Sequence, residues 1–195
     1  MPEFHMNDSE SPAFQALDSF TRGYITALFF TEETPNTVRD AESLYPSARI
    51  WEPESDSSLP GDVGFDDIAP STLARIISDC AKFQAIARCD LVRAENRGRD
   101  LEHCGHDFWL TRNGHGAGFW DRRELEDNSA DYERLTQIMV AAGHDSAAWH
   151  AALKERNALS EKSLGARLTR HCKQFGECDV YLGDDGRVYI MGTES

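Results

Sequence analysis

Residues 105–122 read GHDFWLTRNGHGAGFWDR, and this stretch decides the predicted fold. Two runs rich in aromatic side chains, one around Trp109 and one around Trp120, flank a turn dense in glycine. The pattern is typical of a β-hairpin, because glycine readily adopts the backbone angles that tight turns require. The sequence therefore predicts a two-stranded ribbon over Asp107–Arg122, with its loop at Asn113–Gly116.

The register of this ribbon places Trp109 opposite Trp120 and Asp107 opposite Arg122. Both faces then carry aromatic surface, and a lone hairpin cannot bury both of them. One interpretation is that the indoles lie under a helix or loop, as large aromatic side chains mostly do, with Asp107 and Arg122 as a flanking ion pair. The other is that the tryptophan pair forms a recognition surface, since Trp and Arg dominate binding hot spots.

The recognition-surface interpretation assigns binding to side chains along the ribbon and at its tip: Trp109, Arg112, Asn113, His115, Trp120 and Arg122. The alternative is a ligand pocket or hydrolytic site that also uses the polar side chains His106, Asp107 and Asp121. No catalytic residue is assigned, because Cys104 beside His106 lacks a third group to orient the pair. The histidines and cysteines match no familiar zinc spacing, so no metal and no cofactor are predicted.

The rest of the chain contains several segments with helical periodicity and one further hairpin pattern. Apolar residues at helical spacing predict helices near residues 12–31, 71–96, 132–142, 149–153 and 164–175. Asp179–Leu182 and Arg187–Met191 flank the turn Gly183–Gly186, which predicts a second hairpin. The predicted fold class is therefore α+β, with long amphipathic helices packed on a small antiparallel sheet formed by two C-terminal β-hairpins.

The ends and composition of the chain set its organisation. Met1–His5 read as a cloning scar, which leaves a single α+β domain at residues 6–195. Residues 51–70 are rich in proline, glycine and acidic side chains and contain no basic residue, so we expect a partly mobile acidic loop there.

Charge and cysteine usage restrict the function classes. The net charge is −14, from 34 acidic and 20 basic residues, and such a surface repels phosphate, so nucleic-acid binding is disfavoured. It favours docking onto a basic surface of another protein, or simple solubility. Five scattered cysteines suit reduced thiols in the cytoplasm. We expect no membrane span, because no window of about 18 residues is free of charge.

The stretch GHDFWLTRNGHGAGFWDR at residues 105–122, followed by FGECDVYLGDDGRVY at residues 175–189, resembles a family of small phage- and plasmid-encoded proteins. The resemblance implies a mobile-element origin and expression inside a bacterial cell. It supplies no catalytic residues. The chain departs from the family pattern at about residues 125–160, where we expect a helical insertion in place of a short connection.

These observations favour an accessory protein that binds and modulates a bacterial host protein, of the anti-defence or host-takeover type, and that is not an enzyme. The alternatives are a small-ligand-binding protein or hydrolytic enzyme that uses the polar segment, and a single-strand nucleic-acid-binding protein with tryptophans as stacking platforms. The last requires a local cluster of Arg112, Arg122 and Arg123 to overcome the net charge.

Overall fold

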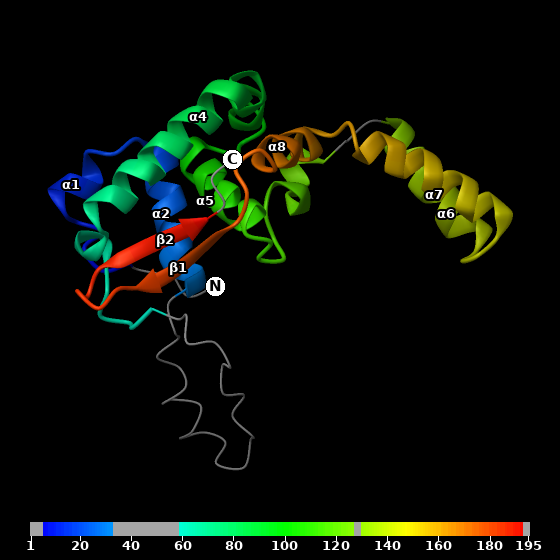
Figure 1. Ribbon diagram of the computed structural model, residues 1–195. Helices are drawn as coiled ribbons and strands as arrows, with labels where there is room; N and C mark the ends of the chain where they lie inside the picture. Colours follow the sequence, from blue (N-terminus) through cyan, green and yellow to red (C-terminus); the bar gives the residue numbers. More distant parts are fainter. Residues whose placement is uncertain (1–5, 33–58, 127–129, 193–195) are drawn as a thin grey trace, which may run out of the picture.

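The computed structural model describes residues 6–32, 59–126 and 130–192 (Figure 1). The predicted cloning scar at Met1–His5 and the part of the acidic loop at residues 51–58 lie outside these described residues. Helices form most of the described chain, and a small antiparallel sheet lies at its C-terminal end, so the α+β class is confirmed. Within this part of the chain, no helix is long and apolar enough to cross a membrane.

The elements follow one another in the order α1 (Pro12–Gln15), α2 (Ser19–Glu32), η1 (Phe65–Asp67), α4 (Pro70–Glu95), α5 (Leu101–Arg112), η2 (Phe119–Asp121), η3 (Arg123–Leu125), α6 (Ala130–Ala142), α7 (Ala147–Ser160), α8 (Leu164–Cys172), β1 (Cys178–Leu182) and β2 (Val188–Gly192). The helix predicted at residues 12–31 is interrupted between α1 and α2. Asp18 starts the second helix there, because its carboxylate accepts hydrogen bonds from the amide and the hydroxyl of Thr21 at 3.0 and 2.6 Å.

The prediction of a hairpin at Asp107–Arg122 is wrong. Its first half belongs to α5, and its second half is a loop followed by the short helix η2. The carboxylate of Asp100 caps α5 by accepting a hydrogen bond of 2.8 Å from the His103 amide. Nearly every side of the helix is buried, so its aromatic residues show no single helical stripe; the buried residues are Cys104, Gly105, Asp107, Phe108, Trp109, Leu110 and Arg112.

The second predicted hairpin is confirmed. β1 and β2 pair antiparallel, with Tyr181 opposite Tyr189, around a turn in which Gly186 has a φ of 74°. Val180 and Val188 are buried against the helices, and the amide of Ala69, just before α4, donates to the carbonyl of Val188 at 3.0 Å. The sheet therefore packs beside α4 and α2 (Figure 1).

The centre of the body is the crossing of α2 and α5. The two helices approach so closely that a Cβ on Gly23 would collide with the Glu102 carbonyl, and one on Gly105 would collide with the Phe20 carbonyl. Phe108 of α5 stacks on Phe83 of α4, with ring centroids 4.2 Å apart. The glycines thus allow three helices to share one aromatic core.

The second part of the acidic loop contributes to this core. Leu59, Val63, Phe65 and Ile68 are all buried, and Phe65 meets Phe14 of α1 edge to face at 5.2 Å. Residues 59–69 therefore pack onto the body, although their composition predicts a partly mobile loop.

Helices α6 and α7 form an antiparallel pair that projects away from the body (Figure 1). We call this pair, residues 130–160, the arm. Only Leu135 and Ala152 are buried among its residues. The arm occupies the region predicted to be a helical insertion.

Candidate functional site

Asp107 is fully buried and engaged by two arginines. Arg99 binds one carboxylate oxygen through Nε at 2.9 Å and Nη2 at 2.8 Å, and Arg122 donates to the other oxygen from Nε at 2.7 Å. The predicted Asp107–Arg122 ion pair is therefore present, although no strands bring it about. Both arginines are mostly buried. Arg99, Asp107 and Arg122 form a triad that links the loop before α5 to the segment after η2.

Arg112 is a structural residue. Its guanidinium donates to the carbonyls of Gly176 and Phe175 at 2.7 and 2.9 Å, to Asp79 at 2.9 Å and to the hydroxyl of Tyr24 at 3.1 Å. Burial raises the pKa of Tyr24 well above its ordinary value, so this hydroxyl is neutral. Arg112 ties α2, α4 and the turn before β1 together, and it is not available to a ligand.

Asn113 and Thr111 also serve the fold. The side-chain oxygen of Asn113 accepts from the Cys178 amide at 2.8 Å, which holds the start of β1. The hydroxyl of Thr111 accepts from the Phe119 amide at 2.9 Å, which holds the start of η2. The loop that was predicted to be a hairpin tip is thus connected to β1 at its start, through Asn113, and to α5 at its end, through Thr111.

Trp109 is fully buried, which removes it from the predicted recognition surface. Its indole N–H donates to the hydroxyl of Thr31 at 2.8 Å, and its ring meets Tyr24 edge to face at 5.1 Å. The ring of His115 stacks near the indole at 6.1 Å, and its Nε2 lies 3.6 Å from a carboxylate oxygen of Glu32. Burial lowers the pKa of His115.

The polar residues predicted to line a pocket do not share one. His106 lies in a crevice of about 390 Å³ with Thr26 and His103, where burial lowers the pKa of its imidazole. Asp107 is held inside the triad with Arg99 and Arg122, and Asp121 is exposed on η2. Among the described residues, no group of three His, Cys, Asp or Glu side chains is placed to hold a metal ion.

The structure does not bring Arg112, Arg122 and Arg123 together as the exposed cluster that single-strand nucleic-acid binding would require. Arg112 is buried and Arg122 is bound to Asp107, which leaves only Arg123 of the three exposed.

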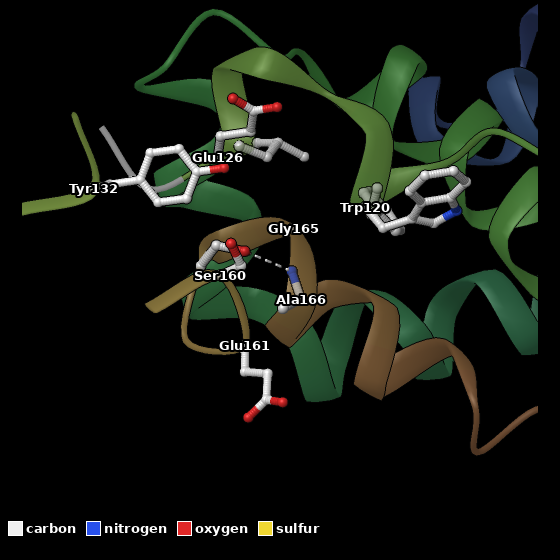
Figure 2. Close-up of a pocket in the computed structure, with 10 residues that line it drawn as sticks. Trp120, Glu126, Tyr132, Ser160, Glu161, Gly165 and Ala166 are labelled. Atoms are coloured by element: carbon white, nitrogen blue, oxygen red, sulfur yellow. Dashed lines mark hydrogen bonds between the residues drawn. The ribbon is translucent and has the colours of Figure 1, made fainter. Parts of the chain in front are cut away.

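Trp120 is the large aromatic residue of this segment that remains at the surface, with 56% of its area exposed. It stands at one side of a hollow of about 320 Å³, where the arm joins the body. Figure 2 shows the indole across this space from Tyr132 of α6, with Glu126 above and Ser160, Gly165 and Ala166 below. We call it the Trp120 hollow.

The floor of the Trp120 hollow is apolar and tightly packed. Phe119 and Leu125 are both fully buried in it. Gly165 lets α8 approach, because a Cβ at this position would press on the Phe119 carbonyl. The hydroxyl of Ser163 caps α8 by accepting from the Ala166 amide at 3.1 Å, the bond drawn dashed in Figure 2.

The walls of the hollow combine aromatic rings with acidic and hydroxyl groups. Glu126, Glu161, Ser160 and Ser163 line it, and none of its lining residues is basic. In Figure 2 the Glu161 carboxylate points away from the space, whereas Glu126 stands at its edge. The arrangement suits an apolar or aromatic side chain with a positive charge nearby.

Sequence reasoning identified Trp120 but missed the residues that complete the hollow. These come from η3, from both ends of the arm and from the start of α8, and no shared motif marks them. Comparisons with models of known protein families, with curated proteins and with solved structures found no match to this chain.

Proposed function

We propose that this chain is a non-catalytic accessory protein, of phage or plasmid type, that binds and modulates a host protein in the bacterial cytoplasm. The observation that carries the proposal is the exposed indole of Trp120 at the edge of the hollow. Tryptophan is the side chain most enriched at binding hot spots, where it inserts into or covers an apolar pocket. Trp109, Arg112, Asn113 and Arg122 are bound into the fold, so the contact is centred on Trp120.

The partner surface is basic. The carboxylate of Glu126 stands at the edge of the hollow and none of the lining residues is basic, and the net charge of −14 draws positively charged surfaces toward the protein. An arginine or lysine beside an apolar anchor would place its charge near Glu126 and its stem against the indole. This chemistry is more specific than the net charge alone.

The test compares two matched variants in a capture experiment from bacterial lysate. Trp120→Ala removes the proposed anchor, and Met191→Ala removes an exposed apolar side chain of β2, a strand that contributes no residue to the hollow. We expect the wild type and Met191→Ala to enrich the same host protein and Trp120→Ala to lose it. The purified host protein should then bind the wild type directly.

Retention of that protein by Trp120→Ala would contradict the proposal. So would its loss from both variants alike, because the contact would then not depend on the hollow. Circular dichroism of both variants serves as the folding control.

A further inference from the structure

The C-terminal hairpin carries an exposed face whose residues are fixed by the strand register. Asp179 of β1 lies opposite Met191 of β2, and Tyr181 lies opposite Tyr189. Because side chains alternate along a strand, these four residues point to the same side of the sheet. We call them the hairpin face.

The other side of the sheet is covered by the body, and its residues are all buried: Cys178, Val180, Val188 and Ile190. The hairpin face is open by comparison. Met191 shows 60% of its area and Tyr181 42%, Asp179 is exposed, and Tyr189 is half-buried. Figure 1 shows the hairpin in front of α2, with no described helix or strand over its near side.

The two tyrosine rings stack at the centre of the hairpin face. Their centroids are 5.4 Å apart, and their planes are inclined by 17°. The hydroxyl of Tyr189 donates to a carboxylate oxygen of Asp185 at 2.9 Å, which holds this ring in place. Each ring uses one face for the stack, so the exposed area of Tyr181 is available to a further planar or cationic group.

Negative charge gathers at the Asp179 end of the hairpin face. Asp179 forms no ion pair with any residue in the described part of the chain. Burial raises the pKa of Glu32 at the end of α2, and the charge of Asp179 nearby raises it further. His115 lies 3.6 Å from Glu32, but burial lowers its pKa, so it supplies no fixed positive charge.

The turn end of the hairpin differs, because its charges are compensated there. The hydrogen bond from Tyr189 and the charge of Arg187 hold the pKa of Asp185 below its ordinary value. On the hairpin face itself, the charge that lacks a counter-ion is therefore that of Asp179.

We propose that the hairpin face binds an arginine-bearing segment of a partner protein. The guanidinium lies flat on the ring of Tyr181 and donates to the carboxylate of Asp179, and an apolar side chain of the same segment covers Met191. Charge complementarity identifies this occupant. One arginine supplies both the positive charge that Asp179 lacks and the flat surface that Tyr181 accepts, whereas lysine supplies the charge alone.

Other occupants fit this face less well. A nucleic-acid base could stack on Tyr181, but the phosphates are repelled by Asp179 and by the net charge of −14. A second copy of the chain brings the same negative charges to the contact and no cation for Asp179.

The hairpin face contributes no residue to the Trp120 hollow, which draws on α6, α7, α8 and the segment at 119–126. The inference therefore goes beyond the proposed function. It gives the protein a second, independent contact, which capture of the host protein through Trp120 does not require.

The test uses a fluorescein-labelled peptide of about eight residues, long enough to run along a strand of the hairpin, in which arginine alternates with threonine. A control peptide carries lysine at every arginine position. The measurements are made at about 150 mM salt, where long-range attraction to the acidic protein is largely screened. Fluorescence anisotropy should show that the wild type binds the arginine peptide at least about threefold more tightly than the lysine peptide.

Three variants locate the contact. Asp179→Asn should weaken binding of the arginine peptide at least about threefold, because the amide has the same shape but no charge. Asp184→Asn removes the same charge from the exposed turn, so it is the matched control and should bind as the wild type does. Tyr181→Ile keeps a side chain suited to a strand but has no ring, so the two peptides should bind to it equally. Trp120→Ala should bind as the wild type does, which separates this inference from the proposed function.

Several results would overturn the inference. Equal weakening by Asp179→Asn and Asp184→Asn would show that the peptide responds only to the net charge. Equal binding of the two peptides by the wild type would exclude the stacked guanidinium. Loss of binding in Trp120→Ala would place the peptide in the hollow, and dimers of the protein alone that Tyr181→Ile abolishes would identify a second copy as the occupant.

Discussion

The carboxylate of Asp107 accepts a hydrogen bond of 2.7 Å from Nε of Arg122, fifteen residues further along the chain. The pair connects the middle of α5 to the residue that follows η2, and Arg99 holds the other carboxylate oxygen. Because the carboxylate is completely buried, its charge depends on these two guanidinium groups for compensation. The segment at 105–122 is therefore held together by charges inside the fold.

Asp107→Asn should destabilise the protein strongly. The amide cannot neutralise Arg99 and Arg122, which are left mostly buried without a counter-charge, and we expect the free energy of unfolding to fall by about 3 kcal/mol. Urea titration followed by circular dichroism measures this value. The matched control is Asp131→Asn, which breaks the exposed pair with Arg134 on the arm and should cost less than about 1 kcal/mol. Equal effects of the two substitutions would show that the buried triad is not important to stability.

Gly105→Ala tests the crossing of α2 and α5. The added methyl would collide with the Phe20 carbonyl, and backbone cannot yield as a side chain can, so the helices must separate. We expect a loss of about 3 kcal/mol or more in the free energy of unfolding. In Gly114→Ala the methyl meets open space, and only the positive φ of 67° opposes it, so the loss should be about 1 kcal/mol. The reverse order of these two losses would contradict the described crossing.

The pH dependence of stability should reflect His106. Burial lowers the pKa of this imidazole in the folded state, so the unfolded chain takes up a proton first as the pH falls. Stability that is fully present above the unfolded pKa of about 6.5 is then lost as the pH decreases. His106→Gln should make the stability loss between about pH 7 and about pH 5 smaller than in the wild type. Urea titrations of the wild type and the variant at the two pH values measure this loss of stability. The same loss in both proteins would mean that His106 is not protected from protonation.

Thr31→Val should lower the stability of the fold, because it leaves the buried indole N–H of Trp109 without a hydrogen-bond acceptor. The Thr31 hydroxyl accepts the N–H of the buried Trp109 at 2.8 Å, and valine has nearly the same shape but no oxygen. A buried donor without a partner costs about 1 to 3 kcal/mol. Thermal unfolding of this variant beside Thr26→Val, at a half-buried position of the same helix, separates the lost hydrogen bond from the change in helix propensity. Similar midpoints for both variants would argue against the bond.

The sequence predicts α4 and the C-terminal hairpin well because each has a local signal. The stripe from Leu73 to Leu91 keeps a helical period over a long helix with one buried side, and Gly186 occupies a turn that requires positive φ. Helix α5 has neither feature. It is buried on nearly all sides, which hides its period, and only Asp100 at its N-terminus marks where it starts.

The candidate site was predictable only in part for a similar reason. Trp120 stands out by residue type, but its exposure follows from η2, which turns Phe119 into the core and the indole outward. Tyr132, Ser160 and Ala166 reach the hollow from α6, the end of α7 and α8. Their meeting depends on how the arm leaves and rejoins the body, and no local pattern encodes such a tertiary relationship.

Hydroxyl-radical footprinting of Trp109 and Trp120 tests the central claim most directly. The oxidation of both side chains is measured with and without the purified host protein captured by the wild type. Trp120, at 56% exposure, should be oxidised rapidly in the free protein and protected in the complex, while the buried Trp109 should stay protected in both. Oxidation of Trp120 at the same rate in the free protein and in the complex would contradict its role as the contact anchor. Rapid oxidation of Trp109 in the folded protein would contradict the assignment of the segment at 105–122 to the core.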